Sequence, residues 1–212
     1  MWRNCLVTSG ALMIDLTGST VEYFSETFVD EALSGETLSH IEFDGCTFKE
    51  CDFSSAVFDH CKFIECEFIR CNLSVVQLKA SRFMDVVFKE SKVIGVDWTR
   101  AAWSNVQLAS PVAFEHSVIN DSSFFGLYLA ELCVEHCKAN DVDFREGDFT
   151  EANFSGSDLS RCLFDGSNLN GANFTDADHY YIDINNCKLK KAIFSRIEAV
   201  NLLESLDIVL VD

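Results

Sequence analysis

Large apolar side chains recur at every fifth residue along most of this chain. One series runs from Phe43 to Leu108, and after a shift of one residue a second runs from Phe114 to Phe194. All phenylalanines except Phe24 and Phe125 fall on these series or on a weaker lead-in that begins at Tyr23. A period of five matches neither an α-helix nor a flat β-strand, so the pattern indicates a repeat architecture.

Small residues mark a second inward position in each five-residue unit. Two residues before most large positions stands Cys, Ala or Ser, so each unit is expected to turn two side chains inward and three outward. If each unit forms one side of a square, four units close a coil of about twenty residues, and coils stack about 4.8 Å apart like parallel strands. The phenylalanines expected to define the core are Phe43, Phe48, Phe53, Phe58, Phe63, Phe68, Phe144, Phe149, Phe154, Phe164 and Phe174.

The units resemble those of a known family. Cys51–Ser55, Ala152–Gly156 and Ala172–Asp176 are similar to the A(D/N)LXX signature of pentapeptide repeat proteins. The resemblance implies an all-β solenoid, a right-handed quadrilateral β-helix, over residues 23–194 with a register slip near 109–113. Residues 1–22 are expected to form an irregular N-terminal segment, and the irregular His179 is interpreted as an imidazole at an inward position.

The C-terminus, residues 195–212, has a different pattern. Ser195–Glu198 has the form of a capping box, and the apolar residues that follow at helical spacing predict a short amphipathic helix. The last six residues have the composition of an exposed β-strand. Pairing with a second copy across a two-fold axis would cover both elements, whereas capping by the helix alone is the alternative. The residues expected in this homodimer contact are Leu202, Leu203, Leu206, Ile208, Val209 and Leu210.

Cysteine and histidine positions weigh against catalytic or metal chemistry. Eight of the ten cysteines occupy the small inward position and no CxxC pair exists, so we expect them to pack as small hydrophobes. His116 and His136 should stack one coil apart near Cys133, which leaves a zinc site as a minor alternative. Asp141–Gly147 begins like a calcium loop, but Arg145 stands at a ligand position. We therefore expect no cofactor, no bound metal and no enzymatic activity.

Charge points to a protein partner. The chain carries 34 acidic and 16 basic residues, a net charge of −18, which disfavours nucleic acid and suits proteins that normally bind it. Acidic bands at 22–60 and 141–183 flank a nearly neutral segment at 61–110. No apolar stretch is long enough for a membrane span and no signal peptide is evident, so we expect a cytoplasmic protein. Solvated acidic faces that bind nothing are the alternative interpretation.

Four stretches outside the repeat consensus resemble the gyrase-protecting members of the family, namely the albicidin-resistance, microcin B17 immunity and Qnr-type proteins. They are Gly95–Thr99, Asn120–Ala130, Tyr181–Ile184 and Leu202–Ile208. The resemblance implies a DNA mimic that binds DNA gyrase and topoisomerase IV and counters an albicidin-like poison. The slip at Pro111 is too short for the projecting loops of Qnr proteins, so quinolone protection is less expected.

The acidic residues expected to contact the topoisomerase are Asp143, Glu146, Asp148, Glu151, Asp158, Asp165, Asp176 and Asp178. A generic protein-interaction scaffold of the same repeat class, with no topoisomerase role, is the alternative function.

Overall fold

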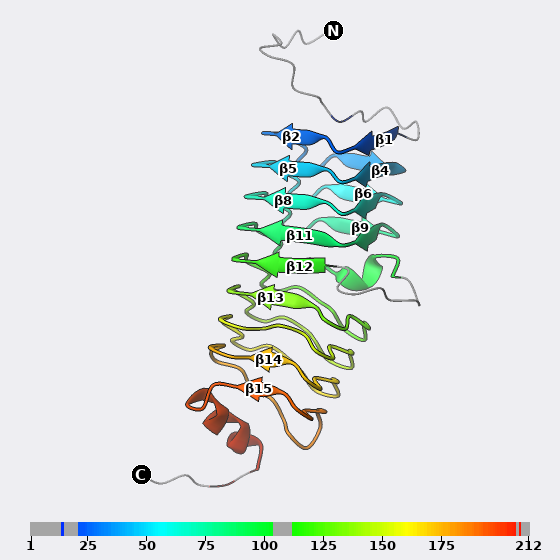
Figure 1. Cartoon of the computed structure of the whole chain (residues 1–212). Coiled ribbons are helices and arrows are strands. Elements are labelled where there is room, and N and C mark those ends of the chain that lie inside the picture. The colour runs from blue at the N-terminus through cyan, green and yellow to red at the C-terminus, as the bar shows by residue number, and fades with distance from the viewer. Residues whose placement is uncertain (1–13, 15–20, 104–111, 207, 209–212) are drawn as a thin grey trace, which may run out of the picture.

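The computed structural model describes Ile14, residues 21–103, residues 112–206 and Ile208. Within these residues the chain winds a parallel β-solenoid of about eight turns with almost no helix. Figure 1 shows the coils stacked as a rod, with β1 near one end and the helix η2 at the other. The five-residue period therefore forms the solenoid that the sequence predicts.

Each side of the rod is a stack of parallel strands. One side pairs β1 (Val21–Phe24), β4 (Ile41–Asp44), β7 (Lys62–Ile64) and β10 (Arg82–Met84). The next pairs β2 (Thr27–Val29), β5 (Thr47–Lys49), β8 (Glu67–Ile69), β11 (Val86–Lys89), β12 (Val112–Glu115) and β13 (Cys133–Glu135). A third side pairs β3 (Thr37–Ser39), β6 (Val57–Asp59) and β9 (Gln77–Lys79). On the fourth side, single parallel bridges such as that of Asp52 with Asn72 join the coils.

The C-terminal half keeps the same register with fewer regular strands. Single parallel bridges join its coils, for example Ser123 with Asp143 and Asp158 with Asp178. The strands β14 (Asn173–Phe174) and β15 (Ile193–Phe194) pair near the end, where Phe174 stands opposite Phe194. The coil spacing thus continues to the last repeat.

Stacked aromatic rings fill the rod. The ring of Phe43 stacks on those of Tyr23 and Phe63, with centroids 5.4 and 5.2 Å away, and meets Phe48 edge to face. All the phenylalanines expected in the core are buried: Phe43, Phe48, Phe53, Phe58, Phe63, Phe68, Phe144, Phe149, Phe154, Phe164 and Phe174. Large apolar surface removed from water along the whole rod is the main stabilising contribution.

The chain turns most corners with a left-handed residue two positions after a core residue. Asp30, Glu50 and Val75 adopt φ values of 57°, 57° and 53°, and Gly126 takes the same place with φ 67°. Corner side chains therefore point outward, and the corner conformation favours Gly, Asn and Asp.

The interruption near Pro111 is larger than the sequence predicts. Cys71 N–H donates to Ser91 Oγ across 20 residues, whereas the equivalent bond from Ser91 N–H to Ser117 Oγ spans 26. This coil therefore holds six extra residues: the phase slips by one residue as predicted, but the interruption is longer than the single residue that the slip indicates. Five of the six extra residues make up one whole repeat and leave the phase of the apolar pattern unchanged. In the sequence, only the sixth residue therefore produces a shift of the pattern. Pro111 and Leu108 lie outside the described residues.

The inward position assigned to His179 is also wrong. Its imidazole is exposed and Nδ1 lies 3.1 Å from Asp158 Oδ1, while Tyr180 is buried instead. The Tyr180 ring packs against Phe174 and Phe194, with centroids 5.7 and 5.6 Å away. The Tyr180 ring thus continues the aromatic column, so the adjacent residue enters the core in place of the imidazole.

The C-terminal helix forms, but without the predicted cap. The segment η2 (Glu198–Leu206) is a 3-10 helix, and Leu202 packs against the core. Ser195 Oγ instead accepts a hydrogen bond from Asp176 N–H at 2.8 Å and donates to Asp176 Oδ1 at 3.0 Å. Ser195 therefore ties the last coil to the one before it. Apart from Ile208, the predicted terminal strand lies outside the described residues.

Candidate protein-interaction surface

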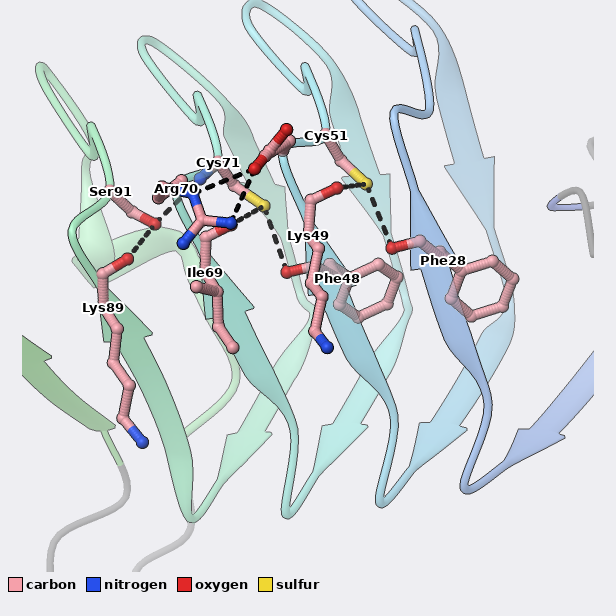
Figure 2. Close-up of polar contacts among 10 residues, drawn as sticks. Phe28, Phe48, Lys49, Cys51, Ile69, Arg70, Cys71, Lys89 and Ser91 are labelled. Carbon is pink, nitrogen blue, oxygen red and sulfur yellow. Dashed lines mark hydrogen bonds and ion pairs between the residues drawn. The ribbon is translucent and has the colours of Figure 1, made fainter. Parts of the chain in front are cut away.

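The small inward cysteines form hydrogen bonds to the backbone. Cys51 Sγ donates to the carbonyls of Phe28 and Lys49 at 3.6 and 3.3 Å, and Cys71 repeats the arrangement one coil on (Figure 2). Ser91 makes the equivalent pair of bonds through its hydroxyl, to the carbonyls of Phe68 and Lys89, and Figure 2 shows the bond to Lys89. These thiols are therefore weak donors as well as small apolar groups, which explains why Cys and Ser alternate at this position.

Burial also makes these thiols poor nucleophiles. Loss of solvation raises the pKa of Cys61 to about 11 and that of Cys66 to about 12. Near neutral pH both groups stay protonated, and a protonated thiol attacks weakly. Cys187, expected at the same inward position, is only half-buried.

His116 and His136, considered above as possible zinc ligands, stack ring on ring. The rings of His116 and His136 lie parallel, with centroids 5.0 Å apart and 4° between their planes. Cys133 is half-buried, and burial raises its pKa to about 11. Among the residues that the structure describes, no group of three or more His, Cys, Asp or Glu side chains is arranged to hold a metal.

The first acidic band is partly neutralised by bases from the following segment. Lys62 Nζ lies 2.6 Å from Glu42 Oε2, and Arg70 pairs with Glu50 at 2.6 Å. Both pairs join residues 20 apart, so each links neighbouring coils. This band therefore offers a partner less negative charge than its composition suggests.

The second acidic band surrounds the rod. The bridges of Asp143 with Leu163, Asp148 with Asn168 and Asp158 with Asp178 belong to three different sides. Glu146 and Glu151 stand at corners, with φ 56° and 61°. The eight acidic residues predicted to contact a topoisomerase are thus distributed around the coils, and Asp158 and Asp178 are direct neighbours.

Some of these carboxylates are already bound within the chain. Burial alone would raise the pKa of Asp143, but hydrogen bonds and charge from Arg145 outweigh it and lower the pKa. Asp158 accepts from Ser160 and lies beside His179. Those left exposed to solvent are Glu146, Glu151, Asp165, Asp176 and Asp178. These five are the most available to an external cation.

Exposed aromatic residues form a feature that the sequence interpretation overlooked. Phe125 is 48 % exposed and Tyr128 is 70 % exposed, and the Arg145 guanidinium lies over the Phe125 ring at 5.7 Å from its centroid. Leu163, one coil beyond Arg145, is 43 % exposed. Phe125 is one of two phenylalanines outside the five-residue series, and that departure was the available signal.

Comparison with known proteins addresses the repeat and the fold. A model described as "Pentapeptide repeat region" matches residues 41–111 and 96–174, and one described as "Pentapeptide repeats (8 copies)" matches 157–196. No curated protein sequence matches the chain. Within the described part of the chain, no helix has the length and apolar character needed to cross a membrane.

Two solved structures are similar. Trypsin-treated QnrB1, a plasmid-mediated fluoroquinolone resistance protein, is 22 % identical over 93 % of this chain and 94 % of that chain, with a TM-score of 0.53. HetL, from the cyanobacterium Nostoc sp. Strain PCC 7120 and involved in heterocyst differentiation regulation, is 12 % identical over 82 % and 85 %, with a TM-score of 0.42. The first similarity supports the same β-solenoid fold.

Proposed function

Because this chain belongs to the pentapeptide repeat family, we propose that it binds DNA gyrase, and topoisomerase IV as well, as a DNA mimic. In this role it protects the enzyme from a poison such as an albicidin-like toxin. The observation that carries the proposal is the ring of exposed carboxylates around the coils between residues 141 and 183. The fold shared with a fluoroquinolone resistance protein is consistent with it.

The distribution of these carboxylates suits a surface that normally holds duplex DNA. DNA presents phosphates all around its axis, about one charge per 1.7 Å. Here acidic side chains repeat around a rod whose coils are about 4.8 Å apart, so a basic groove meets negative charge from several directions. Complementary charge of this kind accelerates association and excludes partners of the wrong sign. The proposal places the protein in the cytoplasm, with no nucleic acid or membrane partner.

We propose that the active form is a homodimer joined through residues 195–212. Ile197, Leu206 and Ile208 are 83 %, 41 % and 51 % exposed, which leaves apolar surface uncovered at this end of the rod. Leu202 and Leu203 are half-buried, and Val209 and Leu210 lie outside the described residues. A dimer would double a rod of about 40 Å to about 80 Å, comparable to some 24 base pairs.

Sedimentation velocity tests the dimer. Leu206→Asp combined with Ile208→Asp should give a monomer at micromolar concentration, because charge disfavours an apolar contact. Val29→Asp, at an exposed site in β2, is the matched control and should leave the mass unchanged. Wild-type protein that sediments as a monomer would contradict the dimer.

A supercoiling assay tests the proposed function. Purified protein should restore gyrase activity in the presence of albicidin, and ciprofloxacin in a parallel reaction tests quinolone protection. Neutralising the five exposed acids to Asn or Gln should abolish rescue while the circular dichroism spectrum is retained. The control neutralises Glu42 and Glu50, which are already paired with bases. Absence of both rescue and gyrase binding by the wild type would refute the proposal.

A general interaction scaffold is the competing function. Internal ion pairs favour it, because Asp141 and Asp143 are bound by arginines of the same chain and offer less charge to a partner. Affinity capture distinguishes the two candidates: enrichment of gyrase subunits supports the first, and their absence supports the scaffold.

A further inference from the structure

We propose that an aromatic patch on one corner of the rod, rather than the acidic charge alone, holds the partner once it is bound. The patch consists of Phe125, Tyr128, Arg145 and Leu163, hereafter the corner patch. Its occupant is a protein surface with an apolar hollow bordered by Lys and Arg. The inference rests on the proposed function, so that surface is taken to be the DNA-binding surface of gyrase.

The corner patch contrasts with the rest of the C-terminal half. Between residues 112 and 180, the large apolar side chains with high exposure are Phe125, Tyr128 and Leu163. Aromatic residues and Arg are the types enriched in the energetically dominant centres of protein interfaces. Single exposed apolar residues need no explanation, but a Phe and a Tyr on either side of one corner, with an Arg over the Phe ring, indicate a contact site.

Three neighbouring coils contribute to the patch. The buried residues Phe124 and Phe144, which precede Phe125 and Arg145, stack with centroids 5.3 Å apart. This places the Phe125 ring directly beneath the Arg145 guanidinium. On the third coil, Leu163 is bridged to Asp143. The patch therefore extends along the rod axis and does not depend on one coil.

The Arg145 side chain of the patch is held in place before any partner binds. Asp143 holds Arg145 through two hydrogen bonds, from Nε to Oδ1 at 2.9 Å and from Nη2 to Oδ2 at 2.8 Å. The guanidinium is thus fixed against the ring of Phe125, in a cation–π arrangement. Side chains that are already ordered lose little conformational entropy on binding, which favours affinity.

The corner between Phe125 and Tyr128 carries no side chain, because it is formed by a glycine. Gly126 separates Phe125 from Leu127 and Tyr128, and no atom lies within 4 Å of the position that a Cβ at Gly126 would take. The adjoining core residues Phe124 and Leu129 are fully buried, so the backbone is anchored on both sides. Phe125 and Tyr128 therefore project from a fixed corner that a partner can approach closely.

Charge at the border of the patch selects the occupant. Glu146 stands at the same corner one coil on from Gly126, Asp165 lies one coil on from Arg145, and Asp148 is bridged to Tyr128. An acidic border complements a basic one, whereas a second copy of this chain would present like charge. These arguments favour a basic partner over self-association.

Kinetics separate the role of the patch from that of the carboxylates. Charge at the border chiefly sets the association rate and its salt dependence, whereas desolvated aromatic anchors set the dissociation rate. Phe125→Ser combined with Tyr128→Ser should therefore raise the dissociation rate of the gyrase complex about thirtyfold, as loss of interface anchors does. The association rate should stay unchanged.

Surface plasmon resonance with immobilised gyrase measures both rates. The control is Phe24→Ser, which removes an aromatic side chain of 57 % exposure in β1, and it should bind as the wild type does. Glu146→Gln combined with Asp165→Asn should slow association instead. Thermal melting of each variant checks that the fold is retained.

The results for the patch variant and for the wild type test the patch and the proposed function separately. Wild-type binding with an unchanged dissociation rate for the doubly substituted patch variant overturns the inference but leaves the proposed function intact. Loss of dimerisation by that variant in sedimentation overturns it as well, because the patch would then be a self-contact. Failure of the wild type to bind gyrase overturns the proposed function and this inference with it.

Discussion

The rings of Phe88 and Phe114 stack with centroids 5.2 Å apart and 13° between their planes, although the coil that joins them holds 26 residues where others hold 20. Trp103 still packs beside Phe83, one regular coil earlier, and Val112 pairs directly with Val86. The six extra residues therefore belong between Trp103 and Val112, and the aromatic column passes them without a break.

Deleting residues 105–110 should therefore leave the solenoid folded. The deletion restores a coil of 20 residues, and shortening a loop changes its closure entropy by well under about 1 kcal/mol. We expect the melting temperature, followed by circular dichroism, to stay within about 4 °C of the wild type. A much larger loss would mean that residues 104–111 contribute to the core. Gyrase rescue by the same variant shows whether this segment contacts the enzyme.

The sequence could reveal the repeat but not the length of the insertion. An insertion shifts a five-residue pattern only by the number of residues left over after whole repeats of five. An insertion of six residues therefore shifts the pattern by one residue, as a single inserted residue would. The solenoid and the buried phenylalanines followed from the period because large apolar side chains at one phase must share one side of the chain. The exchange of His179 for Tyr180 did not follow, because the coil length there is unchanged and the period alone does not distinguish two adjacent residues.

The surface was less predictable than the core for a related reason. Sequence spacing indicates which residues face outward, but their partners depend on corner geometry and side-chain reach. The ion pairs of Asp141 with Arg161 and of Asp143 with Arg145 offset negative charge that composition alone counts as available. Phe125 was visible as a departure from the period, but its contact with Arg145 required the register of two coils.

Phe63→Ala should be strongly destabilising. Its ring is fully buried between those of Phe43 and Phe83, with centroids 5.2 Å away on each side. Removal of a buried phenylalanine leaves a cavity and costs about 3–5 kcal/mol in the free energy of unfolding. Urea denaturation followed by circular dichroism measures the loss.

The control for this substitution is Phe24→Ala, because Phe24 is exposed and should change stability by less than about 0.5 kcal/mol. In a solenoid each coil contacts mainly its neighbours, so the loss at Phe63 should also broaden the transition. Equal effects of the two substitutions would contradict the stacked core.

Stability should fall as pH rises above the ordinary thiol pKa of 9.0. Burial raises the pKa of Cys61 to about 11 and that of Cys66, Cys137 and Cys162 to about 12. Between pH 9 and 12 the unfolded chain therefore binds fewer protons than the folded one, and stability decreases with pH. At pH 10 each such thiol costs about 1 kcal/mol, and below pH 9 the contribution is fully retained.

Replacing these four cysteines with Ser tests the thiol contribution. Ser already occupies equivalent inward positions and donates to the equivalent carbonyls 23 residues earlier, as Ser81 and Ser157 do. Because a hydroxyl does not ionise in this range, the variant should lose less stability between pH 8 and pH 10.5. Melting temperatures measured across that interval provide the comparison. Parallel declines in both proteins would show that other groups cause the loss.

Val75→Asn should stabilise the protein. Val75 adopts φ 53° at a corner, a conformation that a β-branched residue tolerates poorly, and its side chain is 52 % exposed. Asn enters the left-handed region more readily, which should raise the free energy of unfolding by about 1 kcal/mol in urea denaturation. The control is Val29→Asn, at an exposed strand position in β2, which should be neutral or destabilising. A loss of stability on Val75→Asn would show that the backbone at this corner carries no strain.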